Sequence, residues 1–188
     1  FVATPLLVPF VVIGLIGVAG AGGLLLTQGY RMERITVWLD PAASEKGHQT
    51  IQGLYAIGSG GLFGKGLGQS MQKLGFLPEA NNDMIFSVIC EELGLFGALC
   101  VLALFFALIW RFMVIAVNAP DLYGSMIVVG VIAHIGIQVF INIAVATNTI
   151  PNTGIPLPFI SYGGSSLVFM LLEMGLVLSV SRYINVKK

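Results

Sequence analysis

The segment KLGFLPEANNDMIFSVICEELG, Lys73–Gly94, carries a carboxylate at the point where a polar loop meets an apolar stretch, at Asp83. An Asn or Asp side chain just before an apolar helix accepts the free amides of its first turn, so Asp83 can be a helix cap. A carboxylate at this boundary, beside a loop with lysines and arginines, can equally act as a general base. The helix dipole at a cap keeps the acid ionised but makes it a weaker base. Both roles stay open.

Two further acids, Glu91 and Glu92, follow on the same predicted helix. At 1.5 Å per residue they would lie about 12 Å deeper than Asp83, where charged groups normally face protein or water and often mark function. Glu91 is nearer to Asp83 in angle at about 100° per residue, so we expect it to support the site. For Glu173, in the last apolar stretch, we expect a partly buried acid bonded to a neighbouring helix.

The run GSGGLFGKGLGQS, residues 58–70, raises the question of a phosphate-binding loop. A nucleotide P-loop needs Gly, four residues and then Gly-Lys-Ser/Thr. Here Ser59 stands where the first glycine belongs and Gly66 stands where the hydroxyl belongs. No strand is predicted before the run, and the pattern G-x-G-x-x-G is absent from it, so the sequence disfavours nucleotide binding. What remains is a turn or a glycine-permitted backbone able to approach a ligand closely, with Lys65 available.

A polar stripe formed by His134, Gln138 and Asn142 runs along one side of another predicted helix, because the three residues are spaced four apart. Hydrogen bonding between helices explains such a stripe. A single histidine without a second His or Cys nearby is poor evidence for a metal, so we predict interhelical bonding and not metal ligation.

The elements that must position these residues are membrane helices. Hydrophobic residues make up 56% of the 188 and charged residues only 10%, and the mean hydropathy is +0.93. A hydrocarbon core needs about 20 residues of helix to cross it. The prediction is an all-α, polytopic membrane bundle with one large polar loop at 27–83 and spans at 6–26, 84–110, 126–146 and 165–181. Pro151, Pro156 and Pro158 forbid a regular helix between the last two spans.

Charge distribution suggests an orientation and a context. The formal net charge is zero, which gives no indication of a nucleic-acid partner. Basic residues close to span ends favour the cytoplasm, which assigns Arg111 and the tail 182–188 to the inside and the loop 27–83 to the outside, although Arg31 and Arg34 count against it. Cys90 and Cys100 lie about 15 Å apart along one predicted helix, too far for a disulfide. The start at Phe1, without methionine, suggests a piece of a longer protein.

Several segments together resemble the FtsW/RodA/SpoVE (SEDS) family of bacterial cell-wall synthesis. The matching text comprises YRMERI and WLDP after the first span, then QTIQGLYAIGSGGLFGKGLGQSMQKLGFLPEANNDMIFSVICEELG, and finally PNTGIPLPFISYGGSSL before the last span. Each piece alone is weak. Their order, their spacing and their position at predicted membrane boundaries make the resemblance specific over nearly the whole chain.

The resemblance implies a fold and an activity. Family members have ten transmembrane helices, so the chain would be roughly the C-terminal half, with the loop 27–83 outside the plasma membrane. Members polymerise lipid II into glycan strands and work with a class B penicillin-binding protein that crosslinks them. The chain has Asn81 and Asn82 where many division and elongation members have His-Thr, which leaves the subfamily open and favours a sporulation-type or division-type member.

The resemblance also implies roles for residues. The family's essential aspartate falls on Asp83, which would be the base. The candidates for binding the lipid diphosphate are, in order, Lys65, Lys73, Arg31 and Arg34, each of which could instead be a headgroup or surface cation. The site could also be supported by Glu79, Glu91, Ser161, Gly163 and Gly164. A divalent cation, Mg²⁺ or Mn²⁺, bridging Asp83 and the diphosphate is compatible with this chemistry.

Two other functional classes compete with a glycosyltransferase. A transporter that flips the lipid-linked precursor is suggested by Glu91, Glu92 and Glu173, and it should need membrane-embedded acids more than the boundary aspartate. A noncatalytic scaffold for a penicillin-binding protein would use the apolar spans as a docking surface. Mutations would then change partner binding and leave the polymer yield unaffected.

Overall fold

The computed structural model describes residues 12, 15, 29–43, 47–74, 77 and 80–184, with the side chains of residues 29–31, 43 and 74 excepted. Within these residues every regular element is a helix, as the sequence predicts. The elements in chain order are α2 (Gly29–Leu39), η1 (Pro41–Ala43), α3 (His48–Ser59), η3 (Gln72–Leu74), α4 (Ile85–Val117), α5 (Leu122–Ala146) and α6 (Gly164–Arg182).

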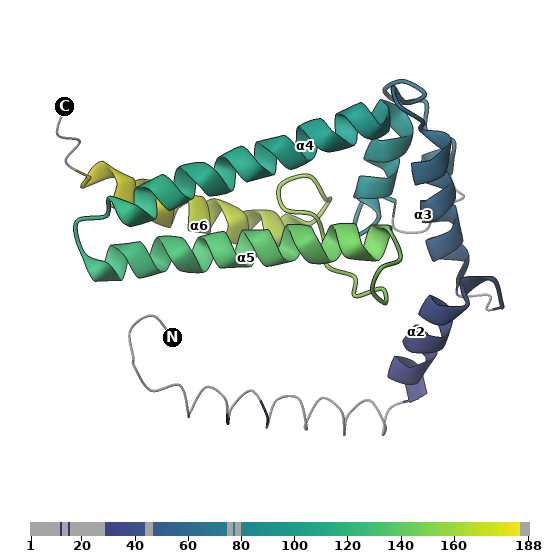
Figure 1. Cartoon of the computed structure of the whole chain (residues 1–188), viewed down its shortest axis with the longest axis horizontal. Coiled ribbons are helices and arrows are strands. Elements are labelled where there is room, and N and C mark those ends of the chain that lie inside the picture. Colours follow the sequence, from purple (N-terminus) through teal and green to yellow (C-terminus); the bar gives the residue numbers. More distant parts are fainter. Residues whose placement is uncertain are drawn as a thin grey trace.

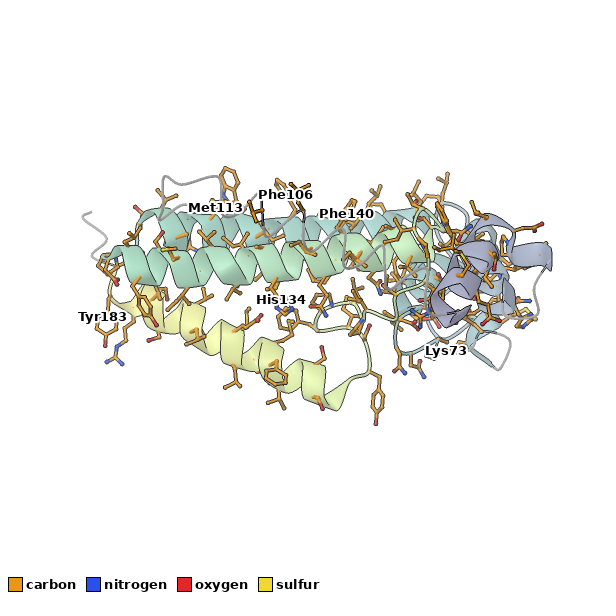
Figure 2. The ribbon with its side chains drawn as sticks, turned by 90° about the horizontal axis from the view of Figure 1, so that it is seen from below. Lys73, Phe106, Met113, His134, Phe140 and Tyr183 are labelled. Atoms are coloured by element: carbon orange, nitrogen blue, oxygen red, sulfur yellow. The ribbon has the colours of Figure 1, made fainter. Side chains whose placement is uncertain are left out.

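Three of the helices, α4, α5 and α6, are long and apolar enough to cross a membrane. They lie side by side and form the body of the molecule (Figure 1). Their shared core includes Phe105, Val128, Ile135 and Val177. Other apolar side chains, such as Phe106 and Phe140, point outward (Figure 2) and are each 70% exposed, as expected for a surface that faces lipid or further helices. The predicted span at 6–26 lies outside the described residues, apart from positions 12 and 15.

Helix α4 is not continuous, which corrects the regular helix expected from residue 84 onward. Gly94 has φ +68° and ψ −168°, a non-helical conformation that divides α4 into two helices. Figure 1 shows the first part turning sharply away from the rest, so that it runs beside α3 while the longer part runs beside α5. Glu91 and Glu92 therefore do not lie 12 Å further along the spanning helix. They lie in the short first part, before the bend.

The large polar loop contains two helices that cover one end of the bundle. Helix α3 buries Thr50, Gly53 and Ala56, all on one side, and packs mainly on the first part of α4. Helix α2 extends from the same end (Figure 1). The loop is thus a folded layer built on the bent end of α4, and this layer surrounds the turn that carries Asp83.

The proline-containing segment 149–163, between α5 and α6, has no regular helix, as predicted. It turns back onto the bundle at the end where α3 lies (Figure 1). Asn142, fully buried near the end of α5, fixes it there, because its side-chain amide donates to the carbonyls of Ile155 and Asp83, each at 2.8 Å. One side chain of the predicted polar stripe thus ties three separate segments together.

Candidate active site

Asp83 lies in the turn 80–84 that leads into α4. The N-cap residue of α4 is Met84, so Asp83 is one residue ahead of the cap position, and the residue is buried, with 8% of its surface exposed. Its Oδ1 is 3.5 Å from the Nε2 of Gln49 on α3. A Cβ atom added at Gly154 would lie 3.9 Å from Oδ2, so the proline-containing segment passes close to the other oxygen. Three segments distant in sequence therefore meet at this carboxylate.

The turn is held from the other side by the start of the predicted SYGGSS motif. The Ser161 hydroxyl donates to the Asn82 carbonyl at 2.6 Å and accepts from the Leu157 amide at 2.7 Å, and the Tyr162 amide donates to the Asn81 carbonyl at 2.8 Å. Ser161 thus fixes the backbone next to Asp83.

Gly163 and Gly164 begin α6, where Gly163 is the N-cap residue. Both line an open apolar pocket of about 480 Å³, together with Asn81 and Ile85. The structure thus brings these two predicted supporting residues to a pocket beside the turn of Asp83.

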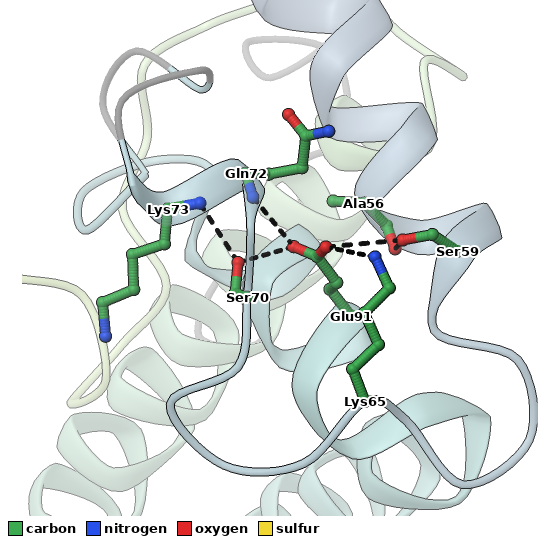
Figure 3. A network of polar contacts seen from close by, with 7 residues as sticks. All are labelled: Ala56, Ser59, Lys65, Ser70, Gln72, Lys73 and Glu91. Carbon is green, nitrogen blue, oxygen red and sulfur yellow. Dashed lines mark hydrogen bonds and ion pairs between the residues drawn. The ribbon is translucent and has the colours of Figure 1, made fainter.

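Glu91, at the other end of the short first part of α4, is at the centre of a polar network (Figure 3). Its carboxylate is fully buried, and Lys65 Nζ lies 2.7 Å from Oε1. The Ser70 hydroxyl donates to Oε2, and the Gln72 amide approaches the same oxygen at 3.4 Å. Both oxygens of Glu91 therefore have donors from the glycine-containing loop, and the ammonium of Lys65 is used to neutralise a buried acid.

The glycine run closes the break in α4 through its backbone. The amides of Lys65 and Gly66 donate to the carbonyls of Glu91 and Glu92, and the amides of Leu95 and Phe96 donate to the carbonyls of Gly61 and Leu62, at 2.9 to 3.1 Å. A broken helix near a membrane is tolerated only where the freed backbone groups find partners. The loop supplies those partners. The close backbone approach that the glycines permit is therefore an approach to α4 and not to a bound ligand.

Glycine is required at this junction for two reasons. Gly64 and Gly94 have φ angles of +78° and +68°, where side chains with a Cβ are strained. A Cβ at Gly94 would lie 2.4 Å from the Gly64 nitrogen, and a Cβ at Gly64 would lie 2.2 Å from the Glu92 carbonyl oxygen. The two backbones touch because both residues lack side chains.

The other predicted cations are distributed differently. Lys73 is exposed and points away from the Glu91 network in Figure 3, while its amide donates to the Ser70 hydroxyl at 3.1 Å. Arg34 on α2 donates to the carbonyl of Asn152 at 2.9 Å. The side chain of Arg31 and the whole of Glu79 lie outside the described part of the chain, so their predicted roles stay predictions.

A chain of polar side chains that sequence reasoning missed leads away from Asp83. The Oε1 atom of Gln49 accepts from Asn152 at 3.3 Å, and the carbonyl of Asn152 accepts from Arg34. Beside them, Trp38 Nε1 donates to the Asn148 carbonyl at 3.0 Å. No local spacing identifies Gln49 or Asn152, since they come from elements more than 100 residues apart; the only signal is that both fall within the text that carries the family resemblance.

His134 and Glu173 form the predicted interhelical contact. His134 Nδ1 and Glu173 Oε1 lie 2.7 Å apart, which joins α5 to α6. The prediction for Glu173, a partly buried acid bonded to a neighbouring helix, is confirmed. The two cysteines, Cys90 and Cys100, are both free.

Comparison with known proteins identifies the family and several relatives that this chain resembles. Residues 1–186 match the family FTSW_RODA_SPOVE, described as "Cell cycle protein". The chain is 55% identical over 97% of its length to stage V sporulation protein E of Bacillus subtilis (strain 168). It is 44% identical over 89% of its length to a probable peptidoglycan glycosyltransferase FtsW of Geobacter sp. (strain M18). The aligned parts cover 50% and 46% of these relatives, so the chain spans about half their length.

Solved structures agree with this assignment. One, described as "Structural coordination of polymerization and crosslinking by a peptidoglycan synthase complex", matches with a TM-score of 0.69 and 28% identity over 95% of this chain and 50% of that one. The rod shape determining protein RodA of Thermus thermophilus matches with a TM-score of 0.53 and 38% identity over 70% of this chain and 39% of that one.

Proposed function

Because the chain belongs to the FtsW/RodA/SpoVE family, we propose that the protein of which it is a part is a peptidoglycan glycosyltransferase that polymerises lipid II. Several curated relatives are named probable peptidoglycan glycosyltransferases, at 44 to 46% identity. The observation that carries the proposal is Asp83, a buried carboxylate at which α3, the start of α4 and the proline-containing segment converge. Convergence of distant segments on one acid is what a positioned proton acceptor requires.

The reaction needs few protein groups. The 4-hydroxyl of an acceptor GlcNAc attacks C1 of a MurNAc, the new glycosidic C1–O bond forms, and the bond from C1 to the polyprenyl diphosphate breaks. In this proposal the hydroxyl proton passes to the carboxylate of Asp83. Burial among hydrogen-bonded segments fixes the direction of that carboxylate. A fixed carboxylate accepts the proton from a hydroxyl that approaches in one particular orientation.

The leaving diphosphate needs cationic or amide donors. Lys73 is exposed and its side chain points away from the Glu91 network. Arg34 donates to the carbonyl of Asn152, whose side chain contacts Gln49, the neighbour of Asp83. Lys65 is the less suitable partner, because binding a diphosphate would leave the buried Glu91 without its cation. The order of candidates on the diphosphate side thus becomes Lys73, then Arg34, then Lys65, with Arg31 kept as a sequence-based prediction.

A divalent ion is a separate question. Within the described ranges no three His, Cys, Asp or Glu side chains gather as potential ligands. Mg²⁺ is usually held by one or two carboxylates together with substrate phosphates and water. Asp83 is the carboxylate that this chain would offer to such an ion, and we derive no step of the reaction through it.

The cellular setting follows from the same proposal. The loop layer with Asp83 would face the outside of the bacterial plasma membrane, where lipid II is consumed. The partner would be a class B penicillin-binding protein, consistent with the synthase complex among the structural matches.

The test uses the full-length protein, purified with its penicillin-binding partner and supplied with lipid II in detergent. Glycan chains are separated by length for the wild type and for Asp83→Asn, which keeps the size of the side chain but removes the base. We expect polymer from the wild type and a loss of about 10³-fold or more in the variant. Equal polymerisation by the variant would exclude the role of Asp83.

The same assay separates the competing classes. If neither protein makes polymer, a flippase or a scaffold becomes the better description. A lipid-flip measurement on Glu91→Gln and Glu173→Gln then tests the flippase. Its structural support is weaker than the sequence suggested, because Glu91 lies before the bend with its ion pair to Lys65 and Glu173 bonds to His134.

A further inference from the structure

A polar pocket lies next to the proposed base, between α2, α3 and the start of the proline-containing segment. Its volume is about 170 Å³, and its walls include Glu33, Arg34, Trp38, Gln49 and Asn152. This volume suits a single sugar ring and is smaller than the 300–1,000 Å³ typical of drug-sized ligands. The pocket is formed by elements that are distant in sequence, and Gln49, which lines it, lies 3.5 Å from the carboxylate of Asp83.

The walls favour a neutral ligand that both donates and accepts hydrogen bonds. The amides of Gln49 and Asn152 bond to each other, to Asp83 and to the Gly154 amide, and each keeps a second N–H and a second lone pair on its oxygen for a ligand. Glu33 and Arg34 stand in the same wall. Hydroxyl and acetamido groups match such a mixture. A diphosphate matches it less well than a neutral ring does, because the Glu33 carboxylate offsets the positive charge of Arg34 in the same wall.

Trp38 adds a flat apolar wall. Its Nε1 atom donates to the Asn148 carbonyl at 3.0 Å, so the indole is held at a fixed angle, and its half-buried ring lines the pocket beside Val37. A ring fixed in this way offers a large apolar surface at little further loss of conformational freedom. A sugar ring is a polar ligand with an apolar C–H face, and that face packs on a flat apolar surface such as the indole.

The geometry points to a binding subsite for one neutral N-acetylated sugar ring in this pocket, lined by Trp38, Gln49 and Asn152. The subsite rests on the proposed function, since it would hold the acceptor sugar whose hydroxyl is delivered to Asp83. Gln49 connects the pocket with the proposed base, because its Oε1 faces Asn152 in the pocket wall and its Nε2 faces Asp83. A ring held here is aligned relative to the base by the same side chain.

The experiment compares Trp38→Leu, Trp38→Phe and Thr36→Ala in the full-length protein with its partner. Thr36 is exposed on the same helix and does not line the pocket, so Thr36→Ala is the matched control. One measurement is saturation-transfer NMR with free N-acetylglucosamine as the probe and glucose, which lacks the acetamide, as the comparison. The other is the KM and kcat of lipid II polymerisation.

We expect Trp38→Leu to abolish saturation transfer to N-acetylglucosamine and to raise the KM about tenfold, which corresponds to ~1.4 kcal/mol, with kcat little changed. Trp38→Phe, which keeps an aromatic ring, should keep most of the saturation transfer and a KM close to that of the wild type. Thr36→Ala should behave as the wild type in both measurements. If Trp38→Leu does not fold, Asn152→Asp serves instead, because it replaces the N–H₂ donor with a charged carboxylate oxygen and should raise the KM about threefold.

Unchanged KM and unchanged saturation transfer in the pocket variants would overturn the subsite, even if polymerisation by the wild type is normal. Equal transfer to glucose and to N-acetylglucosamine would likewise contradict recognition of the acetamide. A wild-type protein that binds N-acetylglucosamine through Trp38 but makes no polymer would support the subsite while refuting the proposed function, so the two failures are distinguishable.

Discussion

Asp83 and Glu91 are two buried carboxylates at the two ends of one short helical segment, and they have different surroundings. Glu91 is fully buried, and a lysine, a serine and a backbone amide of one loop converge on it. Asp83 is 8% exposed and lies beside the side chain of Gln49, Gly154 and a polar pocket. Burial alone therefore does not distinguish the proposed base from the other acid. Around Glu91 the donors close a loop onto a helix, whereas around Asp83 separate segments converge beside space for a ligand.

The sharpest test of this difference changes the length of each acid. Asp83→Glu keeps the charge but moves the carboxylate by about one C–C bond. Because a misplacement of about 1 Å at a reacting group can cost 10²-fold, we expect kcat to fall about 100-fold with Tm little changed. Glu91→Asp in the same assay should lower Tm while kcat at low temperature stays within a few-fold of the wild type. The opposite result, with activity lost only in Glu91→Asp, would reverse the roles of the two acids.

The break in α4 gives the next largest effect. Gly94→Ala introduces a Cβ at positive φ that collides with the Gly64 backbone, so we expect a loss of roughly 2 kcal/mol in stability. Hydrogen exchange of residues 60–66 should accelerate, because the amides of Lys65 and Gly66 lose their acceptors on α4. Gly130→Ala on α5 is the control, since nothing lies within 4 Å of a Cβ there. Unchanged exchange in Gly94→Ala would show that the loop does not depend on the bend.

The Lys65–Glu91 pair gives a smaller effect, because the Lys65 side chain is 34% exposed while that of Glu91 is fully buried. Lys65→Met should lower stability by roughly 1–2 kcal/mol, since it leaves Glu91 buried without its cation. The double variant Lys65→Met/Glu91→Leu should recover part of this loss, because an apolar pair avoids the cost of desolvation. Lys73→Met, at an exposed lysine, serves as the control for Tm. If the KM for lipid II increases in Lys65→Met while Tm is unchanged, the lysine contacts substrate and the structural role is wrong.

The smallest expected effect concerns the other support of the Asp83 turn. Ser161→Ala leaves the Asn82 carbonyl and the Leu157 amide without their shared hydroxyl, at a cost of about 1 kcal/mol. We expect a few-fold fall in kcat as well, because the turn that carries Asp83 is held less firmly. Ser165→Ala, at an exposed position of α6, should change neither quantity. Identical thermal melts and rates for the two serine variants would remove Ser161 from the support of the site.

Much of the architecture could be predicted from the sequence, because membrane helices depend on local composition. The apolar stretches at 84–110, 126–146 and 165–181 correspond to α4, α5 and α6, and the three prolines between the last two helices prevent a helix there. The contact of Glu173 with a neighbouring helix was also foreseeable, since an acid inside a bundle needs a partner. These features depend on solvent preference and backbone chemistry, which each segment carries by itself.

By itself, then, the sequence determined the three long apolar helices, disfavoured a nucleotide loop and carried the family resemblance that singles out Asp83. Only the tertiary structure decided that the glycine run closes a break in α4, that Lys65 neutralises Glu91, and that Gln49, Asn152 and Trp38 form a pocket beside Asp83. The physical reason is that these contacts join residues from 26 to more than 100 positions apart, through backbone atoms and amide side chains that have no sequence periodicity. The contacts of the glycine run form only where α4 breaks at Gly94, and the contacts of the pocket form only where α2 and α3 meet the segment after α5.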